Sequence, residues 1–375
     1  MTVRDPARQL GKGYIPSLDG IRAVSFFIVF VAHAGWGNVV PGGFGVTVFF
    51  FLSGFLITTL LRAELEKTGS ISLRAFYLRR ALRILPNFYL VLVCSLIVTK
   101  IGLLSDELVI PAVMSEFGHF TNYRIIFDGY DGLIVGTPLY WSLAIEEHFY
   151  LVFPLIFLAI SRLNWTGRSK ALLCIGICGL VLLWRIILVF GLDSSLDRTY
   201  LATDTRIDSL LFGCALALWF NPTVDSYTPR ARIITARFLL PVAAVALLFS
   251  LIIRDTHLRE TVRYSIQGLS LAPVFVLAIL YPGHLPFRIL NISWLRFVGT
   301  ISYSLYLVHH VVLYAVWENT TLDRTAAALL ALAVSLALAV AIHLCIERPV
   351  QFLRNRLRTQ NSGSRSATIN PATAT

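Results

Sequence analysis

The sequence predicts an all-α protein that crosses a membrane many times. Hydrophobic residues make up 56% of the 375 residues and charged residues only 14%, far from the balance of a soluble domain. Apolar runs close to the roughly 20 residues that span a bilayer recur along the whole chain. We therefore expect one polytopic membrane domain over residues 1–358, followed by a small, polar, disordered cytoplasmic tail over residues 359–375.

About ten segments are long and apolar enough to be transmembrane helices. They lie near residues 18–36, 42–61, 83–103, 139–160, 170–190, 205–220, 236–253, 264–281, 297–316 and 325–346. The first long apolar segment already holds polar residues, so we interpret it as a retained helix and not as a signal peptide. An even number of spans places both termini on the same side of the membrane.

Positive charge predicts which side that is. If the N-terminus is inside, most of the 32 Lys and Arg residues fall on cytoplasmic tails, loops and helix ends, and most of the 21 Asp and Glu residues lie outside. Because Lys and Arg favour cytoplasmic loops, both termini are predicted to be cytoplasmic. Basic loops facing anionic lipid also account for the formal net charge of +11. The expected partner is the lipid bilayer, with no nucleic acid.

The first span, SLDGIRAVSFFIVFVAHAGW, contains Arg22 and His33. Ionisable groups in lipid cost free energy, so they indicate a functional site by default. Their separation of eleven residues is close to three helical turns, which puts both side chains on one face about 16 Å apart. Histidine changes charge near neutral pH, so His33 could take a proton from a hydroxyl. The alternative is a structural histidine bonded to a neighbouring helix.

Three arginines, Arg79, Arg80 and Arg83, crowd the cytoplasmic start of the third span in FYLRRALRILP. Guanidinium groups bind phosphate oxygens well, so a phosphorylated ligand could dock there from the cytoplasm. The alternative is that these arginines are only the positive charge that orients the helix.

The fourth span begins with PLYWSLAIEEHFYLVFP, in which Glu146, Glu147 and His148 are consecutive. Two adjacent carboxylates beside a histidine at the edge of lipid are hard to explain by packing. Glu147 and Tyr150 lie three residues apart and share a helix face, so the carboxylate could orient a catalytic imidazole. A structural ion pair is the alternative.

Two further polar clusters interrupt apolar segments. The first, in TDTRIDSLLFG, consists of Asp204, Arg206 and Asp208. The second, in GTISYSLYLVHH, consists of Tyr303, Tyr306, His309 and His310. A local ion pair and an interfacial aromatic belt are the simplest interpretations. The candidate substrate-binding residues are Glu146, Asp204, Arg206, Tyr303 and His309.

All five cysteines fall within apolar spans, at Cys94, Cys174, Cys178, Cys214 and Cys345. We interpret them as buried thiols and not as disulfides or zinc ligands, because no histidine or second pair accompanies the C-x3-C spacing. The sequence carries no metal, flavin or nucleotide fingerprint, so we expect no metal and no tightly bound cofactor.

Together these motifs resemble the acyltransferase-3 family of integral membrane O-acyltransferases. The resemblance rests on LDGIRAV with Arg22-x10-His33, GVTVFFFLSGFLI, Arg80-x2-Arg83, WSLAIEEHFYL, TDTRIDSLLFG and SYSLYLVHH, in this order from about residue 14 to 350. Thr47 stands where many members have Asp, and His148 where many have Gln.

The resemblance implies transfer of an acyl group, usually acetyl, from acyl-coenzyme A to a hydroxyl. The implied acceptors are cell-surface carbohydrates or secondary metabolites such as macrolides, and acyl-coenzyme A is then a cosubstrate. By motif, His33 falls on the family's catalytic residue with Arg22 as its partner, and Glu147 falls on the conserved acid of the WSLxxEE pattern. Arg80 and Arg83 fall on its coenzyme-A-facing arginines, and the candidate catalytic residues are His33 and Glu147. The candidate acyl-coenzyme A contacts are Arg22, Arg79, Arg80 and Arg83.

We expect such an enzyme in the bacterial inner (plasma) membrane. A rival interpretation is a proton-coupled transporter or flippase of a lipid-linked sugar, in which the same Arg, His and Glu residues form a proton relay. A sensor or scaffold is disfavoured by the number of ionisable residues within apolar spans.

Overall fold

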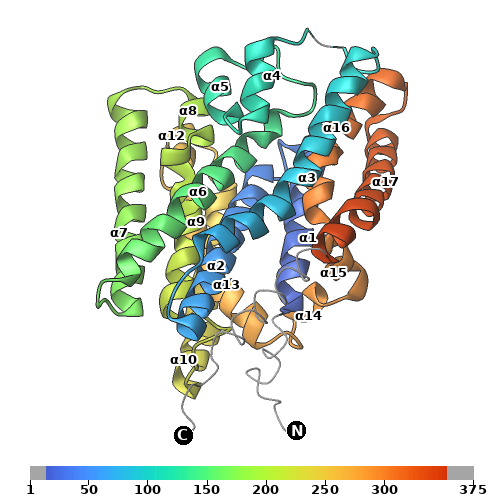
Figure 1. Cartoon of the computed structure of the whole chain (residues 1–375). Coiled ribbons are helices and arrows are strands. Elements are labelled where there is room, and N and C mark those ends of the chain that lie inside the picture. Colours follow the sequence, from blue (N-terminus) through green and yellow to red (C-terminus); the bar gives the residue numbers. More distant parts are fainter. Residues whose placement is uncertain (1–13, 106, 353–375) are drawn as a thin grey trace, which may run out of the picture.

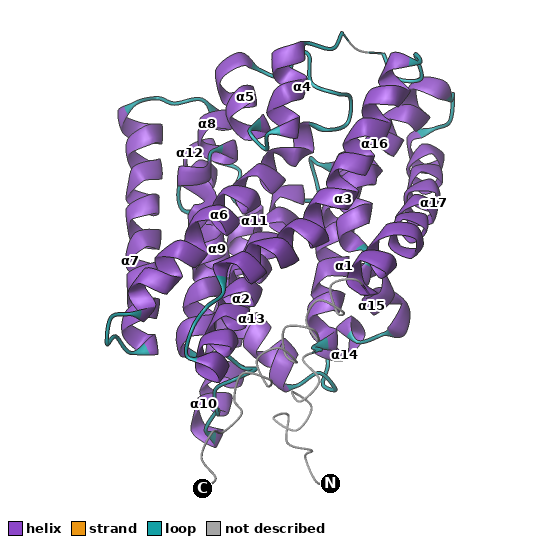
Figure 2. Cartoon of the chain, in the orientation of Figure 1, coloured by secondary structure: helices purple, strands orange, loops and turns teal. Residues whose placement is uncertain are grey.

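A computed structural model describes residues 14–105 and 107–352, and this part of the chain is built from helices and loops (Figure 2). The all-α prediction is confirmed. The predicted disordered tail at 359–375 and the end of the predicted domain at residue 358 lie outside the described residues.

Eight helical segments in the described part are long and apolar enough to span a membrane. They are α1 (Pro16–Val31) with the π-helical turn η3 (Ala32–Trp36), α2 (Gly42–Thr68), α3 (Leu73–Lys100), η4 (Pro138–Tyr140) with α6 (Trp141–Ser161), α7 (Gly167–Ile186) with η5 (Ile187–Gly191), α10 (Pro229–Ile234) with η6 (Thr235–Leu239) and α11 (Leu240–Ile252), α13 (Arg263–Leu280), and α17 (Arg324–Ile342) with η7 (His343–Glu347).

The two other predicted spans differ from straight transmembrane helices. The predicted span at 297–316 is two helices, α15 (Ser293–Thr300) and α16 (Ser302–Asn319), which meet at an angle of 74° and count as one broken span at most. The predicted span at 205–220 is α9 (Thr203–Trp219), a helix of only 17 residues. The described residues therefore hold eight candidate spans, or nine with the bent pair, where ten were expected.

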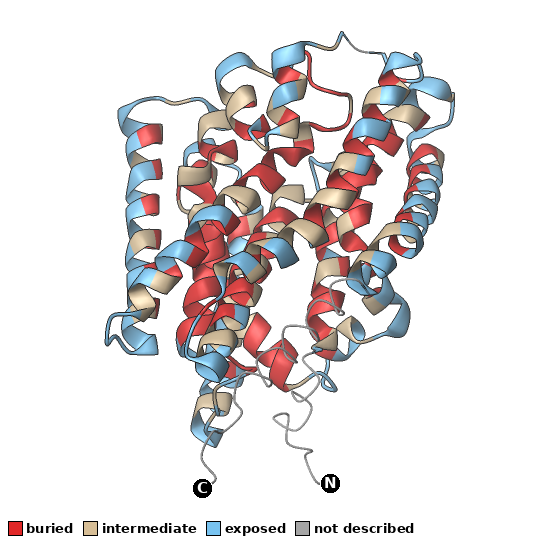
Figure 3. Cartoon of the chain, viewed as in Figure 1, coloured by how far each residue is buried: buried red, intermediate tan, exposed pale blue. Residues whose placement is uncertain are grey.

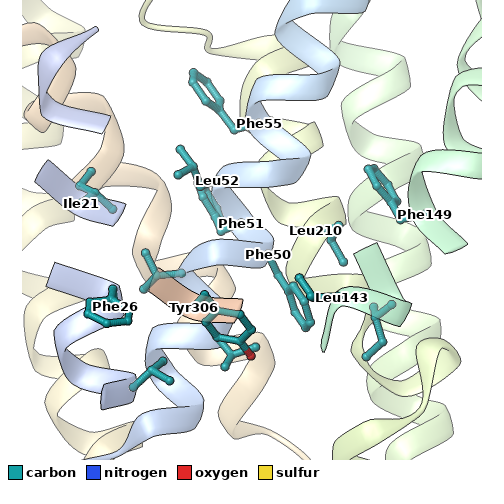
Figure 4. Packing of buried hydrophobic residues seen from close by; sticks show 14 of the residues in the cluster. Ile21, Phe26, Phe50, Phe51, Leu52, Phe55, Leu143, Phe149, Leu210 and Tyr306 are labelled. Carbon is teal, nitrogen blue, oxygen red and sulfur yellow. The ribbon is translucent and has the colours of Figure 1, made fainter. Parts of the chain in front are cut away.

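The short helix α9 lies inside the bundle. Figure 3 shows it buried along most of its length, whereas α7 and α17 at opposite edges of the molecule expose one face (Figures 1 and 3). In Figure 4, Leu210 of α9 lies beside Phe50 of α2 within the hydrophobic core. Because protein and not lipid surrounds α9, it can carry charged residues in its first turns.

Glycine allows α2 and α9 to approach closely. A Cβ atom on Gly54 would collide with the backbone of Leu210, and one on Gly213 would collide with the backbone of Phe51. Small residues at helix contacts are typical of membrane proteins, since van der Waals packing holds the helices together there. Similarly, a Cβ on Gly299 of α15 would collide with the backbone of Asp19, so α1 is fixed against α15.

Short helices gather at the two ends of the bundle (Figure 1). At one end lie α4 (Ile110–Phe117), α5 (Thr121–Asp128), α8 (Leu196–Leu201) and α12 (Thr256–Glu260). At the other end lie α10, α14 (Phe287–Leu290) and the start of α1. The cytoplasmic location of both termini stays a prediction.

The interpretation of all five cysteines as buried thiols is correct for three of them. Cys174, Cys178 and Cys214 are buried, but Cys94 of α3 and Cys345 of η7 are exposed on the helix bundle. An apolar run does not distinguish the helix face that packs on protein from the face that contacts lipid, and these two residues lie on outward faces.

Candidate functional site

A narrow pocket brings several of the predicted site residues together. We call it the intramembrane pocket, and its volume is about 120 Å³. Its apolar walls include Phe50, Leu143 and Tyr306, which Figure 4 shows near one another. Its ionisable side chains come from α1, α3 and α6 and are Arg22, Arg80, Arg83, Glu146 and Glu147. Tyr303 of α16 also lines it, and its hydroxyl donates to the Ile84 carbonyl oxygen at 3.1 Å.

Glu146 is bound by hydroxyl groups within the pocket. Its Oε1 accepts a hydrogen bond from Ser53 Oγ at 2.8 Å, and its Oε2 accepts one from the Tyr150 hydroxyl at 3.0 Å. The Arg80 guanidinium lies 4.0 Å from the centre of the Tyr150 ring, a cation–π contact. Tyr150 thus supports Glu146 and Arg80, and not Glu147 as the shared helix face had suggested.

Glu147 differs from its neighbour. It lines the pocket, yet its carboxylate makes no hydrogen bond or ion pair with the described residues. The predicted role of Glu147 in orienting the His33 imidazole is not supported, since the ring contacts of His33 are made by two histidines of α16. The Glu147 carboxylate is instead available to a molecule that enters the pocket.

The arginine cluster divides between two surfaces. Arg80 and Arg83 are one turn apart and both line the pocket, whereas Arg79 pairs with Glu64 at 2.9 Å and keeps 44% of its side chain exposed. Although Arg79 and Arg83 are also close on the helix surface, at i and i+4, Arg79 does not line the pocket. The prediction that Arg79 joins Arg80 and Arg83 is therefore wrong. Arg22 lines the pocket from α1 and pairs with Asp19 at 2.7 Å.

His33 lies in a cluster of three imidazoles. Its Nδ1 is 3.0 Å from His309 Nε2, and its ring centre is 4.5 Å from that of His310. The residue sits on the π-helical turn η3, which Gly35 closes with a φ of 100° that suits glycine. Such turns are frequent at functional sites. Among the described residues no group of three His, Cys, Asp or Glu side chains is arranged to hold a metal.

Hydrogen bonds fix the protons in this cluster. His309 Nδ1 is 2.9 Å from the Tyr306 carbonyl oxygen and 3.2 Å from that of Leu305. Carbonyl oxygens only accept, so His309 Nδ1 carries the proton and its Nε2 presents a lone pair. His33 Nδ1 must then donate to His309 Nε2. In a neutral His33 this leaves Nε2 unprotonated, in a fixed orientation, as a base.

Two helices connect the pocket with His33. Arg22 and His33 both belong to the α1 segment, about 16 Å apart along its axis. On α16, Tyr306 lines the pocket and its ring centre is 5.6 Å from that of His309. Arg22 thus lines the pocket on the helical segment that also carries His33, and His309 contacts His33 from α16.

The Asp204 cluster lies apart from the intramembrane pocket. Asp204 accepts hydrogen bonds from Arg198 at 2.6 and 3.0 Å and from Trp184 Nε1 at 2.7 Å. Arg206 is fully buried, lies 4.0 Å from the centre of the Tyr264 ring and donates to Thr47 Oγ1 at 3.2 Å. Neither Asp204 nor Arg206 lines the pocket, so the structure favours the structural interpretation of this cluster.

Sequence reasoning missed Ser53 and the role of Tyr306. Ser53 is a single serine within the apolar motif GVTVFFFLSGFLI, and a hydroxyl in such a helix is the signal that could have found it. A second polar cluster, around Glu347, was also missed. Glu347 contacts Asn87 at 2.8 Å, Ser304 at 2.6 Å and His343 at 2.5 Å. His148 was singled out, but it contacts Thr203 at 2.8 Å and does not line the pocket.

Comparison with known proteins decides the family. The family model described as an acyltransferase domain matches residues 15–344. The chain belongs to this acyltransferase family. The resemblance found in the motifs is confirmed, and the pocket, the His33 cluster and the helices that connect them all lie within the matched residues.

Two curated relatives are bacterial O-acetyltransferases. The chain is 32% identical over 321 residues to the peptidoglycan O-acetyltransferase OatA of Listeria monocytogenes, covering 80% of this chain and 49% of that protein. It is 32% identical over 316 residues to the O-acetyltransferase OatA of Staphylococcus aureus, covering 80% of this chain and 51% of that protein. The chain thus spans about half the length of these relatives. No solved structure matches it.

Proposed function

We propose that this acyltransferase moves an acetyl group from acetyl-coenzyme A to a hydroxyl of a cell-envelope carbohydrate, in the inner membrane of a bacterium. The observation that carries the proposal is the bare Nε2 of His33, held by His309 at one end of a helix whose other part lines an arginine-rich pocket. The relatives are named as O-acetyltransferases, one of them of peptidoglycan.

The donor would enter the intramembrane pocket from the cytoplasm. Arg22, Arg80 and Arg83 supply guanidinium groups that suit phosphate oxygens. A volume of about 120 Å³ is below that of pockets which enclose a whole drug-sized ligand, so it suits a narrow chain such as the acyl-pantetheine arm. The Glu147 carboxylate would accept hydrogen bonds from the amide N–H groups of that arm.

The chemistry needs one base at the far end of this arm. His33 Nε2 takes the proton of the acceptor hydroxyl while the hydroxyl oxygen attacks the thioester carbonyl carbon. The carbon–sulfur bond then breaks, and the coenzyme A sulfur leaves with the proton from the His33 imidazolium. Throughout, His33 Nδ1 keeps its hydrogen bond to His309, so the ring does not turn between the two proton transfers.

Thioester turnover tests the proposal directly. Purified protein with acetyl-coenzyme A and a panel of saccharide acceptors should release free thiol at a rate that rises with acceptor concentration. A transporter or flippase with the same buried residues would release none. Acetylated acceptor should accumulate in a one-to-one ratio with thiol, and thiol without acetylated product would contradict transfer.

A further inference from the structure

A second cavity opens at the end of the bundle that carries α8 and α12. We call it the loop cleft, and its volume is about 630 Å³. It is lined by the loop between α1 and α2 with the first turn of α2, by α8, by the end of α11, and by α12 with the first turns of α13. None of its lining residues lines the intramembrane pocket.

The loop cleft adjoins the turn that carries His33. Gly37 and Asn38, which directly follow that turn, line the cleft, and the Asn38 carbonyl oxygen accepts a hydrogen bond from Arg254 at 3.2 Å. On α2, Phe44 lines the cleft and Phe49 lines the intramembrane pocket. The His33 turn is therefore followed directly by residues of the loop cleft, and the helix before it carries Arg22 of the intramembrane pocket.

The charges of the loop cleft favour an anion. Glu260 pairs with Arg263 at 3.2 Å, while Asp197 accepts from the neutral Tyr130 hydroxyl at 3.1 Å and keeps its charge, so three arginines and two carboxylates give the lining a formal net charge of +1. Two further arginines line the cleft without a carboxylate partner among the described residues. Arg254 donates to the Asn38 carbonyl, and the Arg259 guanidinium makes no hydrogen bond or ion pair with the described residues. A guanidinium binds a carboxylate through two parallel hydrogen bonds.

The other lining groups suit a saccharide. Asn38 and Tyr200 offer an amide and a hydroxyl group, and behind them Gln267 is buried with its Nε2 donating to the buried Ser250 Oγ at 3.4 Å. Sugar hydroxyls pair with such groups, and sugar rings pack on aromatic faces such as Tyr200. The volume of about 630 Å³ is within the usual range for a small-ligand site.

We propose that the loop cleft is the acceptor site and that it binds an acidic saccharide whose carboxylate is held by Arg254 and Arg259. The inference rests on the proposed function for the transfer step, but the binding step stands by itself. It places the acceptor hydroxyl on one side of His33 and the acyl donor on the other.

Calorimetric titration without acetyl-coenzyme A tests the binding step. The protein in phosphatidylcholine nanodiscs is titrated with a disaccharide of glucuronic acid and N-acetylglucosamine, and with the matched neutral disaccharide of glucose and N-acetylglucosamine. The acidic disaccharide should bind about tenfold more tightly, because a charge-assisted hydrogen bond is worth about that factor. Arg259→Gln should abolish this preference, and Arg259→Lys should retain part of it.

Arg230 provides the matched control. It is an exposed arginine on α10 that lines neither cavity, and Arg230→Gln should leave the preference unchanged. Equal binding of the two disaccharides, or a preference that survives Arg259→Gln, overturns the proposal. Loss of disaccharide binding in phosphatidylglycerol nanodiscs would assign the cleft to a lipid headgroup and would also overturn it. If the preference holds but wild-type protein releases no thiol, the proposed function fails and the binding site stands.

Discussion

Arginines line both the intramembrane pocket and the loop cleft, but the two cavities differ in the groups that compensate the arginine charge. In the pocket, Arg80 lies on the Tyr150 ring and two carboxylates line the same walls. In the cleft, Arg254 and Arg259 face the cavity with no carboxylate partner among the described residues. Charges that lie away from water need compensating groups, whereas a cavity open at the end of the bundle lets water solvate them.

This difference indicates that the two cavities suit different ligands. The intramembrane pocket is about 120 Å³ and stabilises its own charges, so it suits a thin arm that adds little charge of its own. The loop cleft is about 630 Å³ and leaves positive charge for a ligand, so it suits a larger anionic one. Variants that affect one cavity and spare the other test this division.

Loss of the His309 hydrogen bond should have the largest effect on turnover after loss of His33 itself. His309→Ala removes the acceptor that fixes the proton on His33 Nδ1, and general-base assistance is worth on the order of 10²–10⁴ in rate. We expect kcat to fall by about 10², with the KM values for both substrates little changed. His309→Gln places an amide oxygen where Nε2 stood and should recover much of the rate. Equal loss in both variants would indicate that His309 only packs the helix.

Arg80 and Arg79 form a matched pair for the intramembrane pocket. Arg80→Ala should raise the KM for acetyl-coenzyme A by roughly 10- to 150-fold, because a charge-assisted hydrogen bond contributes about 1.5–3 kcal/mol. Arg79→Ala removes a half-exposed partner of Glu64 and should change this KM less than twofold. The measurement is initial rate of thiol release against donor concentration at saturating acceptor. A large effect of Arg79→Ala on this KM would indicate that the donor binds at Arg79 and not in the intramembrane pocket, and would contradict the proposed donor site.

One serine in each cavity allows the two sites to be compared through smaller changes in KM. Ser53→Ala removes one of the two hydroxyl donors to Glu146 in the pocket, and because Tyr150 still donates to this carboxylate, the KM for the donor should rise by only a few-fold. Ser250→Ala removes the partner of Gln267 in the cleft and should raise the KM for the acceptor by a similar factor. Both constants are read from the same two-substrate rate matrix. If Ser53→Ala raised the KM for the acceptor and Ser250→Ala the KM for the donor, the assignment of the pocket to the donor and the cleft to the acceptor would be wrong.

Spacing along one helix predicted part of this site. Arg22 and His33 share α1, and Arg80 and Arg83 share a face of α3, because helical periodicity fixes both relations. Arg79 was grouped with them because it adjoins Arg80 and lies one turn before Arg83, but its side chain pairs with Glu64 and does not line the pocket. Its true partner, Glu64, lies on α2 and had no sequence signal to connect the two.

Relations between distant helices could not be predicted. His33 and His309 are 276 residues apart, and only the packing of α16 against α1 brings them together. Glu147 was expected to orient a catalytic imidazole, but the ring contacts of His33 are made by His309 and His310 of α16. The loop cleft is built from four segments that lie far apart in the sequence, so no single stretch of sequence indicated it.

The most direct test of the account is the specific activity of His33→Ala per folded molecule. The account expects thiol release and acceptor acetylation to fall by about 10²–10⁴, since the variant lacks the base, while acetyl-coenzyme A still binds with near wild-type affinity. Donor binding measured on the same preparation is the control for folding. Folded His33→Ala that binds acetyl-coenzyme A and turns over at a near-normal rate would contradict the catalytic role of His33.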